Sequence, residues 1–210
     1  SIVASLLFTK PPDQLRVLMV DPKRVELTPF NGIPHLIAPV IVDVEKVNPA
    51  LRAMMREMFL RYKLMEDIGT RNIAGYNAKS KEKMPYLVLI VDELADLMMV
   101  GGFEIEQNLV RLAQLGRATG IHLVLATQRP SVNVVTGLLK ANIPARVAFA
   151  VASQVDSRVI LDTVGAEKLL GKGDMLLLNN DSPKSRRVQG TLVYDEEIDR
   201  VVDFWNNQKG

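Results

Sequence analysis

Short apolar runs alternate with longer segments of helical periodicity along most of the chain. Tyr86 to Val91 are six apolar residues in succession, and such a run without polar alternation is typical of a strand buried on both faces. Further strands are expected at 16–20, 121–126, 147–151, 175–178 and 188–194. Helical spacing or capping residues predict helices at 51–65, 104–117, 131–142 and 153–165, and a last helix from Asp195. The run 2–8 is too short to separate helix from strand.

This alternation indicates an α/β fold. Helices that connect parallel strands pack on the faces of the sheet. We therefore expect a mostly parallel sheet flanked by helices, with an antiparallel hairpin near the C-terminus. The length of 210 residues suits a single domain, 1–210. Within the 51–65 helix, Glu57 and Arg61 have the spacing of a favourable ion pair on its flank.

Composition narrows the class of protein without identifying a partner. Hydrophobic residues make up 48% of the chain, which is ample for a packed core and excludes wholesale disorder. The absence of Cys excludes a disulfide scaffold, a zinc finger and a cysteine nucleophile. No apolar run approaches the roughly 18–20 residues of a membrane span. The formal net charge of +2 neither requires nor excludes a nucleic-acid partner, because a balanced total can contain a basic patch.

Two adjacent carboxylates, Asp92 and Glu93, directly follow the strand 86–91. In open α/β sheets the ligand crevice lies at the carboxyl ends of the strands. There the first carboxylate could hold Mg²⁺ and the second could take a proton from water, which is the Walker B pattern of P-loop nucleoside triphosphatases. The alternative is an acidic helix N-terminus, where Asp and Glu are favoured by the helix dipole.

A Walker B strand works with a phosphate-binding P-loop, G-x-x-x-x-G-K-[ST], and this motif does not occur in the sequence. The nearest stretch, 165–173, has the wrong glycine spacing. It also places Gly173 where a Ser or Thr would bind Mg²⁺. We therefore reject it as a phosphate-binding loop.

Two single residues are weaker candidates. Gln128 follows the strand 121–126 and could contact a γ-phosphate or the attacking water, although polar turn residues are ordinary at such a place. Arg117 lies in a short basic turn and could pair with a carboxylate or act as an arginine finger in a neighbouring subunit's site. A surface Arg is the simpler interpretation of that position.

Other polar residues have open or structural interpretations. Asp21, Lys23 and Glu26 follow the first strand and could form an ion network within a loop or sense a nucleotide. His35 and His122 have no metal-ligand spacing partner, so we expect both to be structural. A solvated face of the hairpin is expected at Lys184, Arg186 and Arg187.

Several segments, in the same order, resemble the FtsK/SpoIIIE family of double-stranded DNA translocases. The most specific are RATGIHLVLATQRPSV at 117–132 and KANIPAR at 140–146. Other matches occur at 19–27, 32–36, 61–65, 71–77, 91–99 (VDELADLMM) and 156–176. The resemblance covers essentially the whole chain, so it is more specific than any single motif.

The resemblance implies a RecA-like P-loop motor domain that forms a homo-hexameric ring and pumps duplex DNA through its centre with ATP and Mg²⁺, during chromosome segregation and cell division. Asp92 matches the Mg²⁺-binding acid and Glu93 the catalytic base. Gln128 matches the sensor glutamine, and Arg117 fits an arginine finger that acts in trans. The candidates for contacts with DNA phosphates in the channel are Lys140, Arg129 and Arg158.

In this family the Walker A loop lies immediately upstream of a segment similar to 1–7. The resemblance therefore implies that Ser1 falls inside the helix that the P-loop opens, so that the motor domain is truncated just after this loop. We expect the chain alone to bind ATP poorly and to be inactive. The resemblance also implies a parent protein anchored in the membrane, with its motor on the cytoplasmic face of the bacterial inner membrane.

Two other functions remain open alternatives. One is a related ring ATPase that moves another cargo, as a secretion or conjugation motor. The other is a non-catalytic assembly module on the same fold, which would suit the missing Walker A loop. The intact pair Asp92 and Glu93, together with Gln128, argues against a loss of catalysis.

Overall fold

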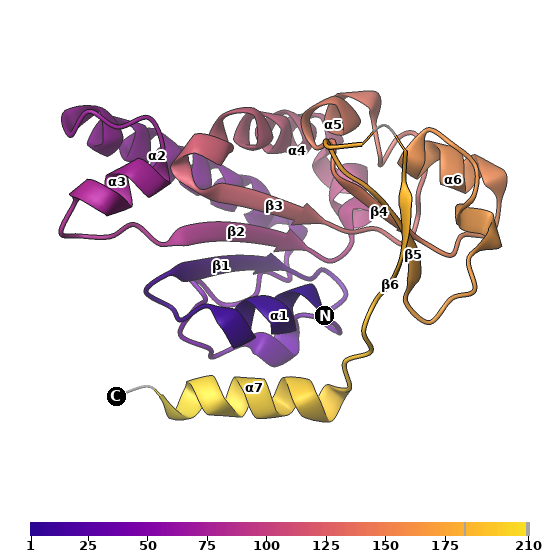
Figure 1. Cartoon of the computed structure of the whole chain (residues 1–210), viewed down its shortest axis with the longest axis horizontal. Helices are drawn as coiled ribbons and strands as arrows, with labels where there is room; N and C mark the ends of the chain where they lie inside the picture. The colour runs from indigo at the N-terminus through magenta and orange to yellow at the C-terminus, as the bar shows by residue number, and fades with distance from the viewer. Residues whose placement is uncertain (183, 209–210) are drawn as a thin grey trace. The chain divides into compact units, whose positions relative to one another are not determined.

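The computed structural model describes residues 1–182 and 184–208. The chain divides into two compact units (Figure 1). The sheet unit comprises Ile2–Thr127 and Asp195–Gly210, and the hairpin unit comprises Gln128–Tyr194. Whether both units act as one motor domain stays a prediction.

A parallel three-stranded sheet forms the centre of the sheet unit. Its strands β1 (Leu15–Val20), β2 (Tyr86–Val91) and β3 (Ile121–Leu125) lie in the order β1-β2-β3. All three correspond to predicted apolar runs. β1 and β2 are buried along most of their length, as expected of strands covered on both faces, whereas β3 is only partly buried. The parallel α/β part of the predicted fold class is therefore confirmed.

Helices cover both faces of this sheet (Figure 1). The α-helices of the sheet unit are α1 (Ile2–Thr9), α2 (Val47–Asp67), α3 (Ile73–Lys79), α4 (Leu94–Gly116) and α7 (Asp195–Asn207). Short 3₁₀ turns occur at η1 (Thr28–Phe30), η2 (Val44–Lys46) and η3 (Arg117–Thr119). In Figure 1, α1 and α7 lie on one side of the sheet and α2, α3 and α4 on the other. None of the helices within the described ranges has the length and apolar character needed to cross a bilayer.

Two of these helices differ from the sequence prediction. The ambiguous run near the N-terminus forms α1, with Val3 and Leu7 buried. The helix predicted at 104–117 begins ten residues earlier as α4, because two helical segments join across a kink at Gly101 (φ −144°, ψ 38°). Glycine is permissive for such a backbone conformation.

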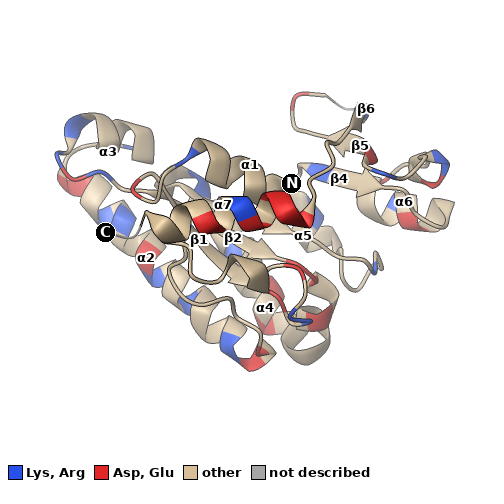
Figure 2. Cartoon of the chain, turned by 90° about the horizontal axis from the view of Figure 1, so that it is seen from below, with Lys and Arg blue, Asp and Glu red and all other residues tan. Residues whose placement is uncertain are grey.

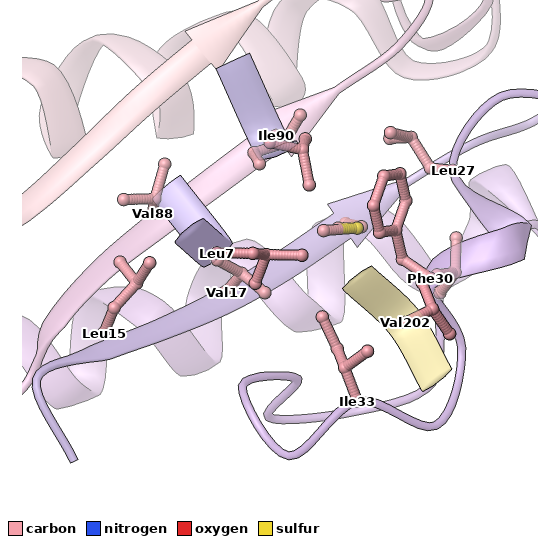
Figure 3. Packing of buried hydrophobic residues seen from close by; sticks show 12 residues of the cluster. Leu7, Leu15, Val17, Leu27, Phe30, Ile33, Val88, Ile90 and Val202 are labelled. Carbon is pink, nitrogen blue, oxygen red and sulfur yellow. The ribbon is translucent and has the colours of Figure 1, made fainter. Parts of the chain in front are cut away.

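The core below the sheet joins residues from distant parts of the chain. Leu7 of α1, Val17 of β1, Val88 of β2 and Val202 of α7 belong to one buried cluster (Figure 3). Successive side chains of a strand point to opposite faces of the sheet. Leu89, which follows Val88 in β2 and is also fully buried, therefore faces the opposite layer of helices. Burial on both faces fixes the register in which the strand ends meet.

Helix α7 is held against α1 by a polar contact as well as by apolar packing. The Trp205 indole N–H donates to the backbone oxygen of Leu7 at 3.1 Å. The ring of His35, which is buried, meets the Trp205 ring edge to face at 4.6 Å. Burial lowers the pKa of His35, which agrees with its predicted structural role. The acidic first turn of α7, red in Figure 2, suits the positive end of the helix dipole.

The hairpin unit is built on an antiparallel sheet in the order β4-β5-β6. Its elements are α5 (Gly137–Asn142), β4 (Arg146–Phe149), α6 (Gln154–Leu161), η4 (Ala166–Lys168), β5 (Asp174–Leu178) and β6 (Arg186–Gln189). The predicted hairpin is confirmed, although its second strand begins and ends earlier than expected. The helix predicted at 131–142 is shorter, because it begins only after the N-cap Thr136, whose hydroxyl accepts from the Leu139 amide at 3.2 Å.

Candidate active site

Polar side chains gather at the carboxyl ends of the three parallel strands. Val20 of β1 pairs with Val91 of β2, and Val91 pairs with Leu125 of β3. The same registers continue beyond the strands, because the Asp92 amide donates to Val20 at 3.0 Å and the Ala126 amide donates to Val91 at 2.9 Å. Asp21 therefore lies beside Asp92, and Thr127 lies beside Glu93.

Glu93 is buried, with its side chain 1% exposed. Its Oε1 accepts from the Ala95 amide at 3.1 Å and from the Thr127 hydroxyl. Its Oε2 lies 3.9 Å from the ammonium of Lys23. Glu93 is thus the N-cap of α4, so the helix-start interpretation of the sequence is correct for its local structure. That role places the carboxylate at the sheet edge and is compatible with chemistry there.

Asp21 connects the end of β1 to the loop that follows it. The fully buried side chain accepts from the Leu27 amide at 2.8 Å and from the Thr28 amide at 3.3 Å, both through Oδ2. This loop carries Lys23, so Asp21 helps to place the ammonium near Glu93. The other oxygen, Oδ1, is buried and has no hydrogen-bond partner among the described residues.

The electrostatics of the edge are dominated by its acids. Burial raises the pKa of Asp92, and the negative charges of Asp21, Glu26 and Glu93 raise it further, while Lys23 opposes the change. A carboxyl group is shifted in this way where the charged form is desolvated and faces like charges. The edge therefore favours an added cation.

The residues of this edge fit a Mg²⁺ ion that is shared with a phosphate group. Mg²⁺ prefers oxygen ligands and usually binds through one or two carboxylates plus substrate phosphates. Asp92 has the charge for such a role, and the orphaned Oδ1 of Asp21 is an acceptor without a donor. Across the described ranges, no group of three or more acidic, His or Cys side chains could hold a metal ion by itself. The donor set therefore suits a metal–nucleotide complex better than a metal cage made of protein alone.

Arg117 lies at the amino ends of the parallel strands, opposite to the carboxyl ends that carry Asp92 and Glu93. It is exposed and begins η3, just before β3 starts at Ile121. Burial lowers the pKa of the neighbouring His122, and the charge of Arg117 lowers it further. Because β2 alone spans about 20 Å at the rise of a strand, the structure does not bring Arg117 to Asp92 and Glu93 of its own chain.

The other predicted site residues belong to the hairpin unit. Gln128 and Arg129 directly follow Thr127 in the chain and are exposed. Arg158 is exposed on α6. Lys140 is only 18% exposed, and its ammonium donates to Asp162 at 2.7 Å and to the backbone oxygen of Val159 at 3.1 Å.

Lys140 belongs to an ion cluster inside the hairpin unit. Asp162 also accepts from Arg146 at 2.6 Å. Hydrogen bonds from both cations lower the pKa of Asp162. The cluster ties α5 and β4 to the residue that ends α6. In this arrangement the Lys140 ammonium has a local structural partner.

Thr127 is the site residue that the sequence interpretation did not select. A threonine at the end of a strand is ordinary, and its importance comes from the register between β2 and β3. The available signal was the equal offset of Glu93 and Thr127, each two residues after its strand. Lys23 was noted in the sequence, but only the structure pairs it with Glu93.

Comparison with known proteins identifies a family that matches this chain. The model of the FtsK/SpoIIIE family matches residues 1–132. The chain is 53% identical to DNA translocase FtsK of Sporosarcina ureae, over 97% of this chain and 27% of that protein. It is 54% identical to DNA translocase SftA of Bacillus subtilis (strain 168), over 99% of this chain and 22% of that protein. The chain thus spans about a quarter of the length of these curated relatives.

Solved structures agree with the fold. The conjugation coupling protein TcpA of pCW3, in a monomer form with ATPgS, superposes with a TM-score of 0.83 at 28% identity, covering 97% of this chain and 59% of that one. The cytoplasmic domain of the type VII secretion ATPase EccC of Thermomonospora curvata superposes with a TM-score of 0.79 at 24% identity, covering 100% of this chain and 26% of that one. These neighbours confirm the P-loop ATPase fold that was predicted.

Proposed function

Because the chain belongs to the FtsK/SpoIIIE family, we propose that it is part of an ATP-driven translocase of double-stranded DNA. The observation that carries the proposal is the pair Asp92 and Glu93 at the carboxyl edge of the parallel sheet, with the pKa of Asp92 raised by burial and neighbouring acids. The relatives named DNA translocases cover nearly the whole chain at 53–54% identity. The conjugation protein TcpA, at 28%, supports the alternative cargo less strongly.

In ATP hydrolysis at this edge, each carboxylate would have a separate role. Asp92 would hold Mg²⁺, which neutralises charge on the β- and γ-phosphates when it is bound. Glu93 would accept a proton from the attacking water, and its hydrogen bonds to Ala95 and Thr127 hold the carboxylate in a fixed direction. Gln128, which follows Thr127 in the chain, would contact the γ-phosphate or this water.

Assembly into a homo-hexamer gives Arg117 a role in trans. The residue is exposed at the amino ends of the strands, opposite to the acidic edge of its own sheet. In a ring, that edge of one subunit would face the nucleotide of the next, where a guanidinium stabilises charge in the transition state. We place this ring on the cytoplasmic face of the bacterial inner membrane, in a protein anchored through a region outside these 210 residues.

Duplex DNA would be held by phosphate contacts from the hairpin unit. Arg129 and Arg158 are exposed candidates. Lys140 would have to give up Asp162 before it could reach a phosphate, so we rank it below the two arginines. Binding of this kind tolerates any sequence and weakens with salt, with a log–log slope of about −0.9 per neutralised phosphate.

The test of this proposal is ATP hydrolysis in a protein of the relatives' length, extended upstream through a P-loop. Glu93→Gln should keep ATP binding and lower duplex-stimulated hydrolysis by about 10²-fold or more, because the amide cannot accept the proton. Glu66→Gln, an exposed position on α2, is the matched control and should hydrolyse ATP normally. We expect no turnover from the 210-residue chain alone, since it has no Walker A motif. Unchanged hydrolysis by Glu93→Gln would refute the assignment.

A further inference from the structure

We propose that Thr127 is a positioning residue for the catalytic carboxylate of Glu93. This inference rests on the proposed function, because it concerns how the base of ATP hydrolysis is held. The observation that carries it is the hydrogen bond from the Thr127 hydroxyl to Glu93 Oε1 at the carboxyl edge of the sheet.

The two oxygens of the Glu93 carboxylate have different surroundings. Oε1 receives donors from two elements, the Ala95 amide in the first turn of α4 and the Thr127 hydroxyl after β3. Two donors from separate directions define the rotation of the carboxylate as well as its position. Oε2 lies on the side of Lys23, at 3.9 Å from the ammonium.

The position of Thr127 follows from the sheet. Val91 pairs with Leu125, and Glu93 and Thr127 each lie two residues further along their strands. Parallel strands are about 4.8 Å apart, which brings a short side chain within reach of the neighbouring carboxylate. A β-branched side chain also has few χ1 rotamers, so the hydroxyl is held in place before any nucleotide binds.

Burial makes this hydrogen bond more important. Glu93 is almost completely buried, and an ionised carboxylate in such a place needs donors to remain charged. A hydroxyl that donates to a carboxylate makes a charge-assisted bond, which is stronger than a neutral one. Removal of the hydroxyl takes away one of the donors that fix Oε1, so the carboxylate should be held less firmly in its direction.

The chemical step determines how much a displaced Glu93 carboxylate would slow the reaction. In hydrolysis the water oxygen bonds to the γ-phosphorus, the bond to the bridging oxygen of the departing ADP breaks, and a water proton passes to Glu93. A misplacement of a catalytic group by about 1 Å can lower the rate by about 10²-fold. Thr127 itself touches none of the reacting atoms in this scheme, so its effect should fall on the catalytic rate rather than on nucleotide binding.

The kinetic test compares Thr127→Val with Thr127→Ser in the protein of the relatives' length. Val keeps the shape and removes the hydroxyl, so kcat should fall by about 10- to 100-fold while the KM for ATP stays unchanged. Ser restores the donor and should recover most of the rate. Thr70→Val is the matched control, because the Thr70 hydroxyl likewise donates a hydrogen bond within the sheet unit, to the backbone oxygen of Met65 at 3.2 Å, but lies away from the acidic edge. Equal kcat for Thr127→Val and the native protein would overturn the proposal.

A second measurement needs no ATP and uses the 210-residue chain. At one fixed neutral pH, the carbon-13 resonance of the Glu93 carboxyl group should shift in Thr127→Val relative to the native chain and Thr127→Ser, because the carboxylate loses the donor from the hydroxyl. Lys23 and Asp92, which also act on Glu93, are the same in all three chains.

The two measurements separate the failure of this inference from that of the proposed function. A native protein that does not hydrolyse ATP would contradict the proposed function, and the resonance would still show whether Thr127 holds Glu93. An identical Glu93 carboxyl resonance in all three chains would overturn the positioning role.

Discussion

At the scale of single residues, Asp174 in the hairpin unit shows how local contacts change a side chain. Arg187 donates to both carboxylate oxygens of Asp174, at 2.9 and 2.6 Å, and the Leu170 amide donates to Oδ2 at 2.8 Å. The hydrogen bonds from Arg187, and then that from Leu170, lower the pKa of Asp174 to about 2. The bidentate geometry makes this pair more specific than an ordinary surface ion pair.

The pair should be visible in an acid titration. In Arg187→Met the pKa of Asp174, read from its carboxyl carbon resonance, should rise from about 2 toward its ordinary value near 3.8. Because the folded pKa is depressed, the contribution to stability is fully present above about pH 4 and is lost as the pH falls through about 2. Arg186→Met, at the neighbouring exposed position, should leave the titration unchanged. An unchanged pKa of Asp174 in Arg187→Met would contradict this account.

Residue identity alone could not separate these two arginines. The sequence predicted Arg186 and Arg187 together as a solvated face, and both are exposed as expected, but Arg187 is also paired with Asp174. Arg187 pairs with Leu176 across the hairpin, two residues from Asp174, and residues related diagonally in this way remain within reach of long side chains. The same limit applies to Thr127, whose contact with Glu93 depends on the register of two strands.

At the scale of elements, Arg61 joins α2 to the amino ends of the parallel strands. The sequence predicted its pairing with Glu57, and the structure confirms it at 2.8 Å. It does not lie on an exposed flank, because its side chain is 5% exposed. Its Nη1 donates to the backbone oxygens of Pro85 and Thr119, at 2.8 and 2.9 Å. One buried guanidinium thus connects a helix to the segments that enter β2 and β3.

Removal of this guanidinium should destabilise the sheet unit. Arg61→Met fills much of the same space but leaves two backbone oxygens without their donor, so we expect the free energy of unfolding to fall by about 3 kcal/mol. Arg56→Met, an exposed position on the same helix, is the control and should change it by less than about 0.5 kcal/mol. Denaturant unfolding of the 210-residue chain measures both. Equal stability of the two variants would show that Arg61 does not join these elements.

Elements with strong periodicity were predicted well, whereas the starts of α4 and α5 were not. The strands β1 and β2 are apolar because they are buried on both faces, and β3 is apolar although it is only partly buried; the apolar runs of all three are plain in the sequence. The N-terminal extension of α4 depends on Gly101, whose backbone permits a kink between two helical segments. The late start of α5 depends on the cap at Thr136. Hydrophobic spacing alone reveals neither the kink at Gly101 nor the cap at Thr136.

At the scale of the whole molecule, the alternation of strands and helices predicted the fold class and the placement of Asp92 and Glu93 at one sheet edge. It could not predict that Asp21, Lys23 and Thr127 would join them, because those contacts require the order and register of strands far apart in sequence. The family resemblance supplied the motor function, and the matched family and relatives support it.

The central claim of the proposed function is that ATP hydrolysis at Glu93 drives movement along duplex DNA. The measurement is displacement of a third strand from a duplex by the protein of the relatives' length. The native protein and Glu66→Gln should displace it with ATP and fail with a non-hydrolysable analogue, while Glu93→Gln should bind ATP and displace nothing. Displacement at the native rate by Glu93→Gln, or by the native protein without hydrolysable ATP, would contradict the account.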